Sequence, residues 1–310
     1  MKTRRQPMVA KVITSPQGPE LSEVIQGYFR ASSWGMSKNK RLDFIKQHLE
    51  LGITSVDHAD IYGDYECERL FGEALALDKS LRSRLQIITK CDIKLLTDKV
   101  PQRRVKYYDT SAEHIYQSVN NSLERLGVDD IDLLLIHRPD ALLDADEVAE
   151  AFTELNKVGK VRHFGVSNFT PRQFELLQSR LGKMLATNQV EISPLQFDVT
   201  SDGTLDQLQQ YRVRPMAWSC LGGGALFSDS NDPRVQRLQT ELHQIKEEIG
   251  AGSIEEVIYA WVRRLPSHPL PIVGSGKIER VQRVVSALQF TLSREQWYRI
   301  WTAAKGHEVA

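Results

Sequence analysis

The sequence predicts an α/β protein of the (β/α)₈ TIM-barrel class, with an N-terminal β-hairpin and an extra C-terminal helix. Three observations lead to this fold. Short runs rich in β-branched residues alternate with longer segments of helical periodicity. Several runs, such as Leu133 to Ile136, are continuously apolar, which is typical of parallel strands covered on both faces. No G-x-G-x-x-G follows the first strand, which disfavours the alternative of a doubly wound open sheet.

The predicted strands and helices follow one another in regular order. Strands are expected at residues 23–29, 53–59, 86–90, 131–137, 163–168, 187–191, 215–220 and 270–275. Helices are expected at residues 37–51, 65–77, 111–127, 146–158, 171–180, 204–211, 233–249 and 254–264, and another begins after Ser275. Ser111 or Thr110 is expected to cap the 111–127 helix, because its hydroxyl can accept a hydrogen bond from a free N–H group of the first turn.

Two elements lie outside this repeat. Residues 9–16 are predicted to form the hairpin that closes the bottom of the barrel, and residues 293–306 the added C-terminal helix. Barrels of this size occur as one domain, so residues 1–310 are expected to form a single barrel domain.

The bulk composition disfavours several classes of function. The chain carries 40 basic and 40 acidic residues, so its net charge is zero and no nucleic acid or anionic membrane is an expected partner. No apolar run approaches the ~18 residues that span a bilayer. The basic N-terminus lacks a following apolar region, so no signal peptide is expected. Three widely spaced cysteines predict neither disulfides nor a metal site and fit a cytoplasmic protein.

Polar residues stand where the predicted strands end. Asp57 and Tyr62 follow the second strand, Lys90 ends the third and His137 ends the fourth. Three of them have an ordinary alternative: Asp57 as a capping or loop aspartate, Lys90 as a solvated lysine, and His137 as part of a structured turn with the Arg-Pro that follows it. Barrel enzymes carry their chemistry at the C-terminal ends of the strands. Because these residues occur on three successive strands, a shared site is the better interpretation.

These residue types fit the reduction of a carbonyl group. A carbonyl that accepts a hydride becomes an alkoxide and needs a proton, which a tyrosine can donate. A free phenol has a pKa of about 10, and a neighbouring lysine ammonium is expected to lower it. A carboxylate would keep that lysine charged, and a histidine would orient the carbonyl oxygen.

The chain resembles the aldo-keto reductases, and within them a bacterial branch of YdhF-type oxidoreductases. The resemblance covers about residues 24 to 285 and rests on the segments VDHADIYGDYECERLFGEAL, IITKC, DLLLIHRPD, GKVRHFGVSNF, TNQVEISP, MAWSCLGGG and IVGSGKIERV. It implies an NADPH-dependent reductase of aldehydes or ketones. The implied catalytic residues are Asp57, Tyr62, Lys90 and His137, with Tyr62 as general acid.

The resemblance also implies a set of cofactor-binding residues. The nicotinamide carboxamide would be held by Ser167, Asn168 and Gln189, and its ring stacked on Trp218. The pyrophosphate would be lined by Ser219, Leu221, Gly222 and Gly223, with Gly27 approaching from the first strand. Ser275 and Arg280 match the positions that bind the 2′-phosphate. Many members carry a lysine where this chain has Gly274, and Lys277 is a possible replacement at the start of the helix, where free N–H groups suit a phosphate.

The long segment 91–110 is expected to hang over the pocket. It is locally basic, which would favour anionic carbonyl compounds as substrates. The alternative is a surface loop without a role at the pocket. The alternative function is a cofactor-binding regulatory subunit with little or no turnover, as in the channel β-subunits that share this fold. The sequence leaves the physiological substrate and the oligomeric state open.

Overall fold

Eight parallel strands close into a barrel in the computed structural model, which describes residues 8–310. The strands are β3 (Ile25–Gly27), β4 (Ser55–Asp57), β5 (Gln86–Cys91), β8 (Ile131–Ile136), β9 (Val161–Ser167), β10 (Asn188–Glu191), β11 (Met216–Trp218) and β12 (Leu270–Val273). They neighbour one another in chain order, and β12 closes on β3 with Ile272 opposite Ile25. The predicted barrel and the order of its strands are therefore confirmed. The basic segment 1–7, part of the argument against a signal peptide, lies outside the described residues.

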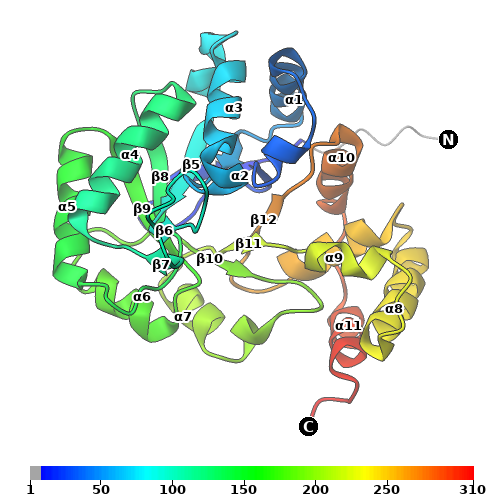
Figure 1. Cartoon of the computed structure of the whole chain (residues 1–310). Coiled ribbons are helices and arrows are strands. Elements are labelled where there is room, and N and C mark those ends of the chain that lie inside the picture. Colours follow the sequence, from blue (N-terminus) through cyan, green and yellow to red (C-terminus); the bar gives the residue numbers. More distant parts are fainter. Residues whose placement is uncertain (1–7) are drawn as a thin grey trace.

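Helices surround the strands (Figure 1). They are α1 (Lys38–Glu50), α2 (Tyr62–Tyr65), α3 (Cys67–Leu75), α4 (Ala112–Leu126), α5 (Ala145–Lys157), α6 (Pro171–Gln178), α7 (Thr204–Gln210), α8 (Pro233–Ile249), α9 (Ile254–Arg263), α10 (Ile278–Ala287) and α11 (Arg294–Lys305). Short 3₁₀ helices are η1 (Ala31–Ser33), η2 (Lys79–Arg84), η3 (Asp198–Thr200) and η4 (Gly222–Phe227). Of the two proposed caps for α4, the structure uses Ser111, whose side chain accepts a hydrogen bond from the His114 N–H.

The N-terminal hairpin is present, but its predicted extent was wrong. Residues 9–16 contain only its first strand, β1 (Lys11–Ile13), and the second, β2 (Glu20–Ser22), lies beyond a turn in which Gln17 has a φ of 65°. Leu21 of β2 is fully buried and packs with side chains from the barrel interior, such as Leu133 and Met216. The hairpin therefore closes one end of the barrel, as predicted.

The added C-terminal helix is α11, and it completes the outer layer. Trp297 of α11 stacks on Trp261 of α9, with ring centroids 5.1 Å apart and an angle of 7° between the planes. Each indole N–H donates to the carbonyl of the other tryptophan, at 3.1 and 3.2 Å. The segment 91–110 contains a small second hairpin that the sequence did not predict, in which β6 (Ile93–Lys94) pairs with β7 (Tyr107–Tyr108).

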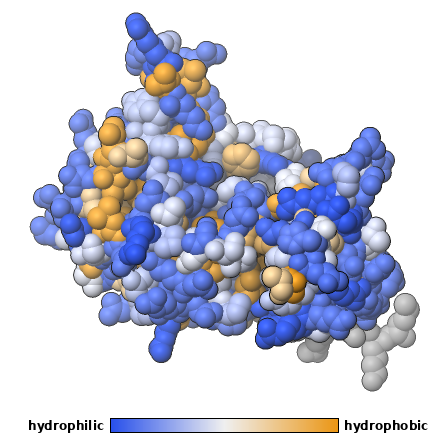
Figure 2. Space-filling model, turned by 90° about the horizontal axis from the view of Figure 1, so that it is seen from below, coloured by the Kyte–Doolittle hydropathy of each residue, from blue (hydrophilic) through white to orange (hydrophobic). Residues whose placement is uncertain are grey.

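The surface and composition of the described part of the chain add three findings. Hydrophobic side chains on the face shown in Figure 2 gather in small separate groups among mostly hydrophilic ones. None of the helices in residues 8–310 is long and apolar enough to cross a membrane. Cys67, Cys91 and Cys220 are buried free thiols, and no cluster of three or more potential metal-binding side chains occurs among these residues.

Candidate active site

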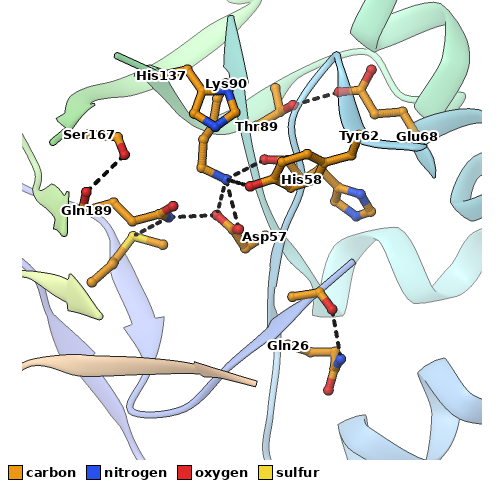
Figure 3. A network of polar contacts seen from close by, with 12 residues as sticks. Gln26, Asp57, His58, Tyr62, Glu68, Thr89, Lys90, His137, Ser167 and Gln189 are labelled. Carbon is orange, nitrogen blue, oxygen red and sulfur yellow. Dashed lines mark hydrogen bonds and ion pairs between the residues drawn. The ribbon is translucent and has the colours of Figure 1, made fainter. Parts of the chain in front are cut away.

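Side chains from neighbouring parallel strands converge at one end of the barrel. Asp57 is the last residue of β4, Lys90 lies near the end of β5, and His137 follows β8 directly. Tyr62 begins α2, on the connection that leaves β4. Because these strands are parallel and in register, their C-terminal ends bring the four side chains together, as Figure 3 shows.

The buried ammonium group of Lys90 is the centre of this cluster. It is 2.8 Å from each carboxylate oxygen of Asp57 and donates to both. It also donates to the His58 carbonyl at 2.7 Å and to the Tyr62 hydroxyl at 3.0 Å. The Lys90 side chain is 0% exposed, so its charge depends on these partners for the stabilisation that water would otherwise provide.

The electrostatics of the cluster keep both the lysine and the tyrosine protonated. Burial lowers the pKa of Lys90, but Asp57 and Tyr62 outweigh it and the net pKa is raised. Burial raises the pKa of Tyr62; the Lys90 charge opposes this and the Asp57 charge reinforces it. The expected net lowering of the phenol pKa is therefore corrected: Lys90 acts in the predicted direction, but burial and the carboxylate prevail.

His137 lies beside the tyrosine as a neutral imidazole. Its ring meets the Tyr62 ring edge to face, with centroids 5.7 Å apart. Burial lowers the pKa of His137 well below its usual range, and the cations of Lys90 and Arg138 act in the same direction. Its Nδ1 is buried and has no hydrogen-bond partner among the described residues. A neutral imidazole in this position can donate one hydrogen bond to a ligand oxygen.

Four residues assigned to the nicotinamide form a chain of hydrogen bonds that reaches Asp57. The indole of Trp218 donates to the Asn168 side-chain oxygen at 3.2 Å, and the Asn168 amide donates to Ser167 Oγ at 2.8 Å. Ser167 Oγ in turn donates to the Gln189 carbonyl at 2.9 Å. The Gln189 Nε2 donates a hydrogen bond to Asp57 Oδ1 at 2.8 Å. The structure thus joins these four residues to the cluster around Lys90.

The residues assigned to the pyrophosphate lie on the turn that follows β11. Ser219, Gly222 and Gly223 have positive φ values of 51°, 58° and 67°, so the backbone curls tightly here. Leu221 packs against the hydrophobic core. A Cβ at Gly222 would collide with the Leu195 side chain, 2.7 Å away. Nothing lies within 4 Å of the position that a Cβ would take at Gly223, so this part of the turn leaves room for a ligand.

Gly27 has a packing reason for lacking a side chain. A Cβ there would lie 2.8 Å from Ile272 Cγ2, so the glycine permits β3 and β12 to approach closely. Beside it, the Gln26 Nε2 donates to the carbonyls of Gly27, Val273 and Ser275 at 3.0 to 3.1 Å. Sequence reasoning missed Gln26, because it lies in the middle of the first strand, Ile25–Gly27, and not at the strand end where polar residues were sought.

The residues assigned to the 2′-phosphate lie at the start of α10. Ser275 Oγ accepts a hydrogen bond from the Lys277 N–H at 3.1 Å, so one of the free backbone donors expected there is already used. Lys277 and Arg280 are exposed, and neither side chain forms an ion pair within residues 8–310. Gly276 packs on the Trp34 ring, where a Cβ would come within 2.5 Å of the indole.

Arg138 is a further residue at this rim that the sequence analysis left without a role. Its guanidinium lies 5.6 Å from the centroid of the Trp218 ring. It directly follows His137, so the same strand-end argument could have singled it out.

Comparisons with known proteins place these observations in a family context. The model of the aldo/keto reductase family matches residues 24–305 of this chain. An Escherichia coli protein named oxidoreductase YdhF is 58% identical over 97% of this chain and 100% of its own length, which confirms the expected branch. A protein of Agrobacterium fabrum named 6-dehydroglucose reductase is 42% identical over 94% of this chain and 97% of its own. A glycerol dehydrogenase structure from Gluconobacter oxydans has a TM-score of 0.81 at 23% identity, covering 98% of this chain and 97% of that one.

Proposed function

Because this chain belongs to the aldo/keto reductase family, we propose that it is an oxidoreductase that uses NADPH to reduce aldehydes or ketones to alcohols, with Tyr62 as general acid. The observation that carries this proposal is the contact between the Lys90 ammonium and the Tyr62 hydroxyl at 3.0 Å, in a site where Lys90 is 0% exposed. A buried cation beside a phenol stabilises the phenolate that remains after the proton has left.

The proton transfer follows from the arrangement of the side chains. The substrate carbonyl oxygen is oriented by His137, which is neutral and buried. When the carbonyl carbon takes up a hydride, the oxygen becomes basic and takes the proton of Tyr62. Lys90 stabilises the resulting phenolate, and Asp57 keeps Lys90 charged and in place. Solvent then returns the proton to Tyr62.

The described residues fit a nicotinamide cofactor, which supplies the hydride when bound. The aromatic face of Trp218 and the polar groups of Ser167, Asn168 and Gln189 surround the rim next to Asp57. The turn at Gly223 leaves room for a ligand. The pyrophosphate would lie along the turn Ser219, Leu221, Gly222 and Gly223, close to Gly27.

The preference for NADPH rests on the charges at α10. Arg280 and Lys277 are exposed cations without ion-pair partners in the described chain, and Ser275 adds a hydroxyl. These groups can bind a phosphate dianion, and Arg280 can do so with two hydrogen bonds. NADH lacks this phosphate, so the same residues would discriminate between the two cofactors.

The decisive experiment is Tyr62→Phe. Loss of the hydroxyl should reduce kcat for carbonyl reduction by at least ~10²-fold, the usual contribution of a general acid, and leave NADPH binding intact. The matched control is Tyr298→Phe on α11, which should retain full activity. A Tyr62→Phe enzyme with unchanged kcat would refute the assignment.

The substrate panel separates the proposed reductase from its rival. NADPH oxidation should be measured with simple aldehydes, ketones and sugar-derived aldehydes, the last because of the relative named 6-dehydroglucose reductase. Turnover of any of these supports the reductase. Tight NADPH binding without any turnover would favour a regulatory subunit instead.

A further inference from the structure

The three residues that follow Tyr62 have an unusual backbone conformation. Gly63, Asp64 and Tyr65 have φ values of 59°, 55° and 68°, in the left-handed region. That region is unfavourable for residues with a side chain, and two of the three are not glycine. Strained backbone of this kind persists only where surrounding contacts hold it in place. The contacts around this turn therefore help to determine the position of the preceding residue, Tyr62.

The segment 91–110 supplies one set of these contacts. The Tyr65 hydroxyl accepts hydrogen bonds from the Leu95 N–H at 3.2 Å and from the Arg103 guanidinium at 3.4 Å. The same Arg103 nitrogen donates to the Leu95 carbonyl at 2.6 Å. We call this group of Tyr65, Leu95 and Arg103 the Tyr65 junction. Nearby, the Lys99 ammonium donates to the Asp64 carbonyl at 2.6 Å.

The opposite side of the turn is closely packed. A Cβ at Gly63 would lie 2.5 Å from Ser32 Oγ and 2.7 Å from Cys67 Sγ, so the chain has no space in that direction. The Arg125 guanidinium lies 5.6 Å from the centroid of the Tyr65 ring. The turn is thus held between the body of the barrel and the segment 91–110.

We propose that Tyr65 is a positioning residue for the proton donor: through the Tyr65 junction, the segment 91–110 holds the left-handed turn and thereby sets where the Tyr62 hydroxyl lies relative to Lys90. The proposal rests on the proposed function of Tyr62. Without the junction, the turn can relax towards a more favourable conformation. The Tyr62 hydroxyl then leaves its position 3.0 Å from the Lys90 ammonium. Small displacements of a reacting group are costly to catalysis.

The test is Tyr65→Phe, which removes the hydroxyl and keeps the ring. We expect kcat to fall about tenfold, because a misplaced donor slows proton transfer, while NADPH affinity stays unchanged. The solvent deuterium isotope effect on kcat should rise, since proton transfer then limits the rate more strongly. The control is Tyr298→Phe on α11, an exposed residue whose hydroxyl forms no hydrogen bond within the described residues. This control should behave as the unaltered enzyme.

A second variant makes the test independent of the folding of the first. Arg103→Met breaks the same junction from the other side and should give the same fall in kcat and the same rise in isotope effect. If both act through one junction, the double variant should lose little more than either single variant. An unchanged kcat in Tyr65→Phe or Arg103→Met would overturn the proposal. A lower kcat with an unchanged isotope effect would overturn it too, because that indicates a merely structural role.

These failures are distinguishable from a failure of the proposed function. Full activity of Tyr62→Phe would remove Tyr62 as donor, and the positioning role of Tyr65 with it. An inactive Tyr62→Phe alongside a fully active Tyr65→Phe would leave the donor assignment intact and refute only the positioning role.

Discussion

Replacing Lys90 by methionine should move the pH dependence of the reaction upward. The Lys90 ammonium lies 3.0 Å from the Tyr62 hydroxyl. At an effective dielectric of ~20, the attraction between the ammonium and a phenolate at this distance is about 5.5 kcal/mol. That energy corresponds to a shift of about 4 in pKa and is an upper limit, because the Asp57 carboxylate counteracts the lysine charge. Without Lys90, the pKa of Tyr62 should rise further above its usual value.

The pH profiles of both directions of the reaction should move upward, but the rates at high pH should change in opposite directions. Reduction requires the protonated phenol, so its decline at high pH should move to still higher pH in Lys90→Met. Alcohol oxidation requires the phenolate as base, so its rise with pH should also move upward, and the rate near pH 9 should fall. Both profiles can be measured from NADPH absorbance, together with NADPH affinity, which should be preserved.

Lys90→Met should be compared with a second variant, because it leaves the buried Asp57 carboxylate without its cation. Breaking a buried ion pair costs about 3–5 kcal/mol of folding stability. The double variant Lys90→Met with Asp57→Asn removes both charges, and should fold more stably while keeping the shifted profile. A change confined to KM for the carbonyl substrate, with unmoved pH profiles, would refute the reasoning and make Lys90 a binding residue.

Two further predictions concern the cofactor phosphate and the substrate. Arg280→Ala should weaken NADPH binding by ~1.5–3 kcal/mol, the range of a charge-assisted hydrogen bond, and leave NADH binding nearly unchanged in a titration. Equal losses for both cofactors would mean that Arg280 supports the fold or the adenine ring. Shortening the segment 91–110 should alter the relative kcat/KM for neutral and acidic aldehydes, because its basic residues would then no longer steer anions. An unaltered order of preference would count against a role in substrate selection.

The barrel could be predicted because its signals are local. Buried parallel strands are continuous apolar runs, and the polar residues that follow them necessarily share one rim. The same reasoning assigns Asp57, Lys90 and His137 to one site from their positions at the ends of the strands. The roles of these residues and the single-domain organisation remain predictions.

Other features depend on three-dimensional surroundings that a sequence does not display. The strands of the small hairpin, such as Tyr107–Tyr108, are two residues long, too short to produce a recognisable pattern. The net pKa of Tyr62 depends on burial, which the identity of its neighbours alone cannot reveal. The left-handed conformation of Tyr65 was not predicted, because it depends on contacts with residues some thirty positions away.

The closure of β12 against β3 has a consequence for how the protein is made. The Gln26 side chain donates to Val273 and Ser275, 247 and 249 positions further along the chain. Contacts of such high sequence separation slow folding, because a long loop must close before they form. On the ribosome, β3 is left with an unpaired edge until almost the entire chain has been translated. An unpaired edge strand invites association with other chains. Newly synthesised molecules should therefore depend on chaperones most strongly just before β12 emerges, and chains truncated ahead of it should aggregate.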